Sequence, residues 1–367
     1  MKHLFLLIIF ALASPSLFSQ QISISPVQAH NDHDSNTFPT KSGALTISDN
    51  QYLFGSAQII QPASWAISEQ KNKLAFLKHR EFLDLKSYNE EGQILIEKEV
   101  EFFDPHDETI QVYQFSDGRI ATRDNVANFT FFDAKGNRVS SVSNSSDSVD
   151  GEQASRLATD RYGKTIVLYN PVIAYGDETG SRASLIIGDL QRQIFFQDHE
   201  RVIERLHVQI DGSFTTLIAS NGTEQEVFVH DRFGNEIFRH IPEDELRGTD
   251  LTDDGRYLTT FTRNRMQVYD ILSGERLGSA SSQSSVLYAT YHPDDEVIVA
   301  FGGSLQGQSI SSPSITAVHL TRRELANEDI SVSLSVLDAD DISITRTAQN
   351  QYRITGLNRH LDVTLQF

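Results

Sequence analysis

The stretch LTDDGRYLTTFTRNRMQVYDILSGERL, residues 251–277, decides the fold. It reads as an Asp-Asp-Gly turn, a β-type run at 257–262, a short turn, a second run at 266–270, a Ser-Gly turn and a last run. Asp-Gly and Ser-Gly steps supply the positive φ angles that tight hairpins need. The Tyr, Thr, Val and Phe residues between them suit pleated, half-buried strands. The stretch therefore predicts consecutive antiparallel strands joined by hairpins.

The same pattern recurs along the chain. Its first halves are anchored at Asp117, Tyr162, Asp211, Asp254 and Asp294, which are 45, 49, 43 and 40 residues apart. A four-stranded propeller blade has a period of about 40–50 residues. One such sheet cannot bury both of its faces, whereas several sheets stacked around an axis can. The sequence therefore predicts an all-β fold, a β-propeller of four-stranded antiparallel blades.

The predicted propeller covers residues 42–367. These 326 residues give about 47 per blade for seven blades and about 54 for six, so seven blades fit the observed steps better, with six or eight left open. Strands from the N- and C-terminal segments are expected to close the ring. Alternatively, residues 330–367 form a small β appendage. Residues 21–41 are polar and contain two prolines, which is typical of a flexible leader.

Residues 251–277 resemble a WD-repeat unit through the segments DDGRYL, VYD and SGERL. The other units depart from that pattern, because the sole tryptophan, Trp65, lies elsewhere and the Gly-His step is absent. The chain is therefore similar to the broader class of WD-like β-propellers found among bacterial exported proteins. The resemblance implies an interaction scaffold that binds other molecules.

The first residues are typical of a signal peptide. Lys2 and His3 precede an unbroken apolar run at residues 4–12, which is too short to span a bilayer. Cleavage is expected between Ala13 and Gln21, so that residues 1–20 are removed. The chain has no cysteine, which excludes disulfides, thiolate sites and a lipid-anchored lipoprotein. The mature protein is expected to be soluble and exported, either periplasmic or secreted.

The net charge of the chain disfavours some classes of binding partner. The formal net charge is −19, from 31 basic and 50 acidic residues. Such a surface repels phosphate backbones and anionic lipids. We therefore expect no nucleic-acid partner and no membrane insertion.

Motifs for chemistry are sparse. The run HNDHD at residues 30–34 contains possible metal ligands but lies in the predicted leader, and the Asp-rich turns match no calcium-binding loop. No G-x-S-x-G elbow or glycine-rich phosphate loop is present, and the histidines do not recur at one blade position. The sequence therefore predicts no catalytic residue, no metal site and no cofactor. The alternative is a propeller-fold enzyme, of the lyase, lactonase or glycosidase type, that acts on envelope or environmental polymers.

The strongest signal for binding lies in the turns predicted between the second and third strands of the blades. The same turn is lengthened at residues 170–184, which include Tyr175, and at residues 302–314. Long loops on a rigid scaffold are common binding sites. Five basic residues also fall in these turns: Lys78, Arg80, Arg123, Arg263 and Arg265.

These turns all lie on one face of a propeller, so we predict that this face binds an anionic protein, peptide or glycan. The alternative is that charged residues simply prefer exposed turns. Acidic turns such as PEDE at residues 242–245 are expected on other surfaces and would steer the partner away from them.

Overall fold

The structure is a computed structural model of the chain. It describes residues 22–25, 27–30, 37–39, 44–48, 51–60, 62, 64–67, 73–79, 83–100, 111–124, 128–142, 156–160, 163–175, 178–187, 191–209, 211–336, 339 and 342–367. Every named element in these ranges is a β-strand. The predicted signal peptide at residues 1–20 lies outside them.

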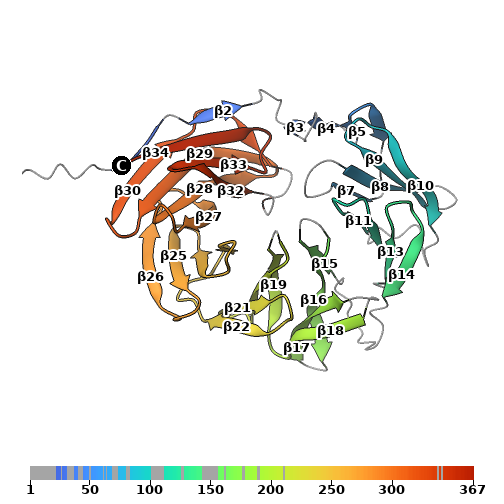
Figure 1. Cartoon of the computed structure of the whole chain (residues 1–367), viewed down its shortest axis with the longest axis horizontal. Coiled ribbons are helices and arrows are strands. Elements are labelled where there is room, and N and C mark those ends of the chain that lie inside the picture. The colour runs from blue at the N-terminus through green and yellow to red at the C-terminus, as the bar shows by residue number, and fades with distance from the viewer. Residues whose placement is uncertain are drawn as a thin grey trace, which may run out of the picture.

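The described strands form eight antiparallel sheets arranged around a centre (Figure 1). We number them as blades 1 to 8. Blade 1 contains β3 (Thr37–Pro39), β4 (Ala44–Ser48), β5 (Gln51–Phe54) and β6 (Ala57–Ile60), and blade 2 contains β7 (Ser64–Ile67), β8 (Lys73–His79), β9 (Leu83–Asn89) and β10 (Ile94–Val100). Blade 3 contains β11 (Gln111–Gln114), β12 (Ile120–Arg123), β13 (Phe129–Phe132) and β14 (Arg138–Val142). Blade 4 contains β15 (Arg156–Thr159), β16 (Ile166–Tyr175), β17 (Glu178–Ile187) and β18 (Gln191–Asp198).

Blades 5 to 7 continue the same order, and blade 8 combines strands from the two ends of the chain. Blade 5 contains β19 (Val202–Val208), β20 (Phe214–Ser220), β21 (Gln225–Asp231) and β22 (Glu236–His240), and blade 6 contains β23 (Gly248–Leu251), β24 (Tyr257–Phe261), β25 (Arg265–Asp270) and β26 (Arg276–Ser281). Blade 7 contains β27 (Val286–His292), β28 (Val297–Gln306), β29 (Ser309–His319) and β30 (Glu324–Asp329). Blade 8 contains β32 (Ser343–Ala348), β33 (Gln351–Thr355), β34 (His360–Gln366) and β1 (Ser23–Ile24). Two short strands add to these sheets, β2 (Gln28–His30) on β34 and β31 (Leu334–Ser335) on β29.

The structure thus confirms a propeller of four-stranded antiparallel blades and has eight of them, one of the numbers that the sequence left open. The favoured number, seven, assumed one constant period along the chain. Blades 1 and 8 break that assumption because few residues separate their strands in the sequence, so each blade uses fewer residues than the central blades. In Figure 1 the first strand of a blade lies nearer the centre, as β19 and β27 do, and the fourth lies outside, as β26 and β30 do.

Strands from the two ends of the chain meet in blade 8. Ser23 of β1 pairs with Gln366 of β34, and Gln28 of β2 pairs with Asp362 of the same strand. Both short strands fall in residues 21–41, so that part of the predicted flexible leader is instead sheet. The physical reason is that β34 would otherwise leave its outer backbone groups unpaired at a sheet edge. Strands β32 to β34 are the inner part of this same blade, as ring closure requires.

The turn predicted at Asp254-Gly255 is confirmed. Gly255 has φ +70°, and its backbone N–H donates to the carbonyl of Thr252 at 2.7 Å. A side chain here would also collide with the ring of Phe214, 2.2 Å from an added Cβ. Only glycine meets both requirements.

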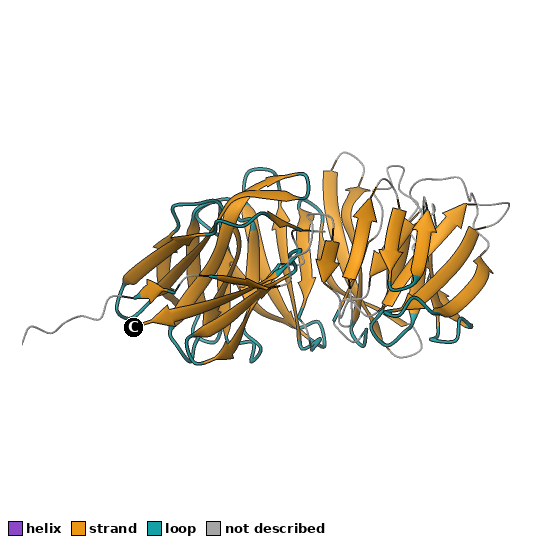
Figure 2. Ribbon diagram, turned by 90° about the horizontal axis from the view of Figure 1, so that it is seen from above, coloured by secondary structure: helices purple, strands orange, loops and turns teal. Residues whose placement is uncertain are grey.

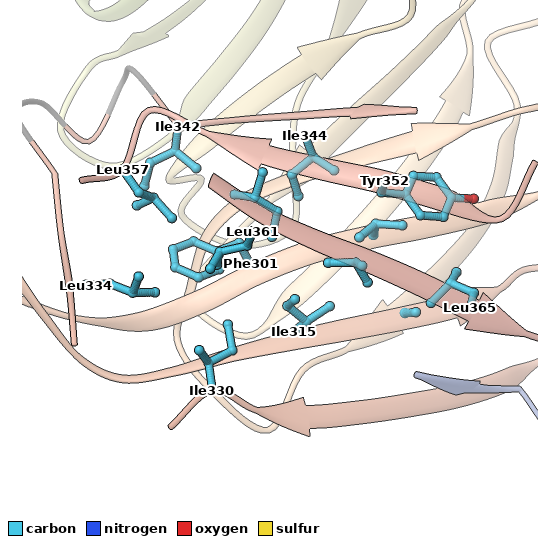
Figure 3. Close-up of a cluster of buried hydrophobic side chains, with 14 of the residues drawn as sticks. Phe301, Ile315, Ile330, Leu334, Ile342, Ile344, Tyr352, Leu357, Leu361 and Leu365 are labelled. Carbon is cyan, nitrogen blue, oxygen red and sulfur yellow. The ribbon is translucent and has the colours of Figure 1, made fainter. Parts of the chain in front are cut away.

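Among the described residues, the buried apolar side chains form seven clusters, each between two consecutive blades. The largest joins blades 7 and 8 and contains Phe301, Ile315, Tyr352 and Leu361 (Figure 3). Side chains that alternate along each strand therefore pack on both faces of a sheet, which explains why the strands carry runs of Val, Ile and Phe. This packing holds the inner strands firmly enough to position a site between them.

Candidate functional site

The antiparallel order of each blade defines two faces of the propeller. The turn between the second and third strands lies at the same end of a blade as the connection to the next blade, because each strand reverses direction. We call this end the upper face; it includes residues 221–224, 241–247, 262–264, 282–285 and 307–308. The opposite end, with residues 252–256 and 271–275, is the lower face. The strands run between these two ends in the view of Figure 2.

Two of the predicted ligand residues lie on the upper face of blade 6. Arg263 is exposed in the turn between β24 and β25. Arg265 is less exposed, and its guanidinium group forms ion pairs with Glu243 at 3.0 Å and Asp244 at 3.2 Å. The prediction that the acidic turn lies on another surface is therefore wrong. Residues 242–245 connect blade 5 to blade 6, and such connections share the upper face.

The other predicted residues are distributed differently. Arg123 is the last residue of β12 and is 3% exposed, because strand β12 continues through a position that the sequence placed in a turn. Lys78 lies in β8 opposite Asp84, and Tyr175 ends β16 opposite Glu178. The side chains of Lys78 and Tyr175, and all of Arg80, lie outside the described residues. The described part of the face therefore brings together only Arg263 and Arg265.

The two long loops expected on this face are hairpins. Strands β16 and β17 each have ten residues, and β28 and β29 have ten and eleven. In the second hairpin Gln306 pairs with Ser309, so Gly307 and Gln308 form the turn, and Gly307 has φ +61°. Ser309 and Ile310 also pair with β31. Both extensions are therefore hydrogen-bonded projections of their blades rather than free loops.

An arginine that the sequence does not indicate as a binding residue lies beside this second hairpin. Arg247 is exposed and donates to Oγ of Ser285 at 2.7 Å. The carbonyl of Ser285 accepts from the N–H of Gly303 in β28, and the carbonyl of Arg263 accepts from the N–H of Val286. The segment 282–285 thus joins Arg247, Arg263 and the base of the hairpin. We call these two arginines and residues 303–311 the upper patch.

A cavity of about 1270 Å³ lies along the inner strands of blades 4 to 8. Its wall includes side chains from β19, β23, β27 and β32. Among them, His207, Asp250 and Tyr288 come from three consecutive blades. The sequence does not indicate that these three side chains meet, because they are about 40 residues apart and share no motif. The one available signal is a carboxylate, Asp250, directly before the stretch 251–277.

The surroundings of Asp250 in this cavity raise its pKa. The hydroxyl of Tyr288 donates to its Oδ1 at 2.6 Å, and Thr290 forms a further side-chain hydrogen bond. Burial raises the pKa of Asp250, while the hydrogen bonds from Thr290 and Tyr288 and the charge of His207 oppose the rise. Burial and the Asp250 charge together raise the pKa of Tyr288 well above its usual range. A histidine and a carboxylate therefore do converge in the central cavity.

The described ranges also give two negative results. They contain no group of three His, Cys, Asp or Glu side chains placed to hold a metal ion. No helix within them has the length and apolar character needed to span a bilayer. His30 lies in β2, and the rest of the HNDHD run lies outside the described residues.

Comparison with known proteins gives structural similarity alone. No family model matches the sequence, and the curated proteins give no match. Among solved structures, the chain is similar to BamB from Moraxella catarrhalis, with a TM-score of 0.50 and 11% identity over 94% of this chain and 100% of that one. It also matches the C-terminal WD40 domain of Sif2, with a TM-score of 0.46 and 11% identity over 95% and 97% of the two chains. At such identity the first similarity shows the fold: the chain is a β-propeller, as the WD-like resemblance implied.

Proposed function

We propose that the protein is an exported, non-enzymatic β-propeller scaffold that binds an anionic protein, peptide or glycan partner at its upper patch. The observation that carries this proposal is the β28–β29 hairpin. It extends beyond the blade, and its tip remains exposed from Ser304 to Ser309. The pairing of Ile310 with Leu334 holds it in place. A preorganised projection binds at a lower entropic cost than a free loop does.

The chemistry of the patch suits a partner that accepts hydrogen bonds. Ser304, Gln306 and Gln308 offer uncharged hydrogen-bonding groups along the exposed hairpin, and Leu305 adds an apolar contact at 37% exposure. Arg247 and Arg263 stand at its base with their charges not paired to a carboxylate in any described ion pair. Two arginines on a chain of net charge −19 favour carboxylate or sulfate groups of a partner.

The location and the excluded partners follow from the sequence. The charged start and apolar run at residues 2–12 support export to the periplasm or beyond the cell. The acidic charge disfavours nucleic acid, and we propose no membrane insertion.

The test starts with the mature chain, residues 21–367, used to capture a partner from envelope extract. Association of the captured partner is then measured over a range of salt concentrations. The double variant R247E/R263E should slow association about tenfold and flatten its salt dependence, because charges at an interface act chiefly on the on-rate. Arg232, exposed on the lower face, provides the matched control R232E. Equal rates for both variants would exclude the upper patch as the binding site.

One observation favours the second candidate function, a propeller enzyme of the lyase, lactonase or glycosidase type. His207 and Asp250 face one cavity, and a carboxyl with a raised pKa can act as a general acid. The test is turnover of envelope glycans and lactones by the wild type and by D250N. Turnover by the wild type that D250N abolishes would support the enzyme over the scaffold.

A further inference from the structure

A buried amide oxygen without a donor lies near two carboxyl side chains along the lower part of the cavity. Gln209 follows β19, is 6% exposed and lines the cavity. Its Nε2 donates to the carbonyl of Thr252 at 2.7 Å and to that of Leu251 at 3.3 Å. Its Oε1 is buried and accepts no hydrogen bond from any described residue. A buried amide oxygen left unpaired is costly, so this atom has an unmet need for a donor.

Two carboxylates lie on the strand and turn that Gln209 contacts. Asp250 is in β23, and Asp253 follows three residues later in the turn to β24. Asp253 is exposed, lines the same cavity and has no hydrogen bond or ion pair among the described residues. Its negative charge also acts on Asp250. The positive charge of His207 offsets part of the charge of Asp250, whereas Asp253 has no such partner among the described residues, so the site keeps an excess of negative charge.

We propose that the lower end of this cavity binds an organic cation, an ammonium or guanidinium group, through Asp250, Asp253 and Oε1 of Gln209. Such a group carries only donors and a positive charge, so it satisfies every acceptor and offsets the excess of negative charge. A sugar hydroxyl would bring donors but would leave the charge of Asp253 uncompensated. A metal ion fits less well, because the described residues provide no set of three metal ligands.

The remaining wall of the site supports the same ligand class. The side chains of Tyr288 and Thr290 hydrogen-bond to Asp250, which fixes the orientation of its carboxyl group. Aromatic rings of Phe214, Tyr288 and Tyr291 also line the cavity. Aromatic faces attract ammonium and guanidinium groups. The site lies at the opposite end of the blades from the upper patch, so the two proposals are independent.

The experiment is isothermal titration calorimetry on the mature chain with cadaverine, a free diamine, and with the blocked peptide acetyl-Gly-Arg-Gly-amide. These probes separate a small-molecule amine from a side chain of a partner peptide. Neutral 1,5-pentanediol and calcium chloride serve as ligand controls at constant ionic strength. We expect one of the two cations to bind with a stoichiometry of one and the controls not to bind.

Asp253 allows a test that does not endanger folding, because its side chain is exposed. D253N should weaken binding of the cation about tenfold, the typical effect of losing one charge-assisted hydrogen bond. D250N should weaken it further. The matched control is E245Q, an exposed carboxylate on the upper face, which should leave binding unchanged. Binding of pentanediol or calcium in place of the cations, equal loss in E245Q and D253N, or no binding by either cation would each overturn the proposal.

Discussion

The hydroxyl of Tyr352 donates a 2.6 Å hydrogen bond to Oδ2 of Asp295, and this bond ties blade 8 to blade 7. Asp295 also accepts from Nε of Arg346 at 2.7 Å and from the N–H of Asn350 at 3.3 Å. Its side chain is 2% exposed, whereas that of its neighbour Asp294 is 74% exposed. Both carboxylates contact Arg346, yet only Asp295 is enclosed.

Replacing Asp295 should therefore open this junction. D295A leaves the hydroxyl of the buried Tyr352 without its acceptor and removes one of the two carboxylates that contact Arg346, so we expect a loss of about 3 kcal/mol in the free energy of unfolding. D294A removes only an exposed ion pair and should cost less than about 1 kcal/mol. Urea denaturation of both variants measures the difference. Equal losses would show that Asp295 does not hold the junction.

His230 should make stability depend on pH between 6.5 and 4. It is 2% exposed and packs against Phe195, and burial lowers its pKa from 6.5 to about 4. In that range the unfolded chain binds a proton that the folded chain does not, so the stabilisation is complete above pH 6.5 and is lost as the pH falls through 4. We expect the free energy of unfolding of H230F to fall less steeply between these values. A slope for H230F equal to that of the wild type would show that His230 does not cause this pH dependence.

Two glycines with the same backbone conformation should respond differently to alanine. Gly255 has φ +70° and Gly274 has φ +73°. An added Cβ would lie 2.2 Å from the ring of Phe214 at Gly255, whereas nothing lies within 4 Å at Gly274. G274A should cost about 1 kcal/mol from backbone strain alone, and G255A about 3 kcal/mol because it also displaces Phe214. Thermal denaturation compares them, and equal shifts in Tm would exclude the steric contribution.

The arginines of the predicted ligand face should separate into structural and surface residues. Arg123 is buried, so R123E places an acid in its pocket and should destabilise the protein by about 3 kcal/mol or more. Arg263 is exposed in a turn, and R263E should change stability by less than about 0.5 kcal/mol. Chemical denaturation of the two variants tests this. A stable R123E would mean that Arg123 lies at the surface after all.

Local chemistry made much of the fold predictable. The Asp-Asp-Gly turn at Gly255 and the regular steps between anchors depend on residues close in sequence, and both features hold in the structure. The edge strands β1 and β2 were missed because their polar sequence resembles a linker and their partner strand is remote. Extension of β28 and β29 was missed because the glycines and serines at 302–314 match loop composition, while the pairing with β31 that orders them is tertiary.

The candidate site was less predictable than the fold. Asp250, Tyr288 and Gln209 each lie in an ordinary strand or turn, and only the stacking of three blades brings them to one cavity. Arg123 was misassigned for a related reason. The strand β12 ends one residue later than the turn pattern indicates, and this single residue moves the side chain from the surface into the wall of the blade.

The pairing of the first strands with β34 has a consequence for chain synthesis. Ser25 and Gln366, which share a side-chain hydrogen bond, are 341 residues apart in sequence. Among the described strands, β1, the outermost strand of blade 8, is therefore translated first, and its partner β34 is translated last. Until β34 is complete, β1 has no strand to pair with, and β33 forms an uncovered edge of blade 8. Blades 2 to 7 can each assemble from neighbouring strands as they emerge, whereas completion of blade 8 must wait for the synthesis of β34.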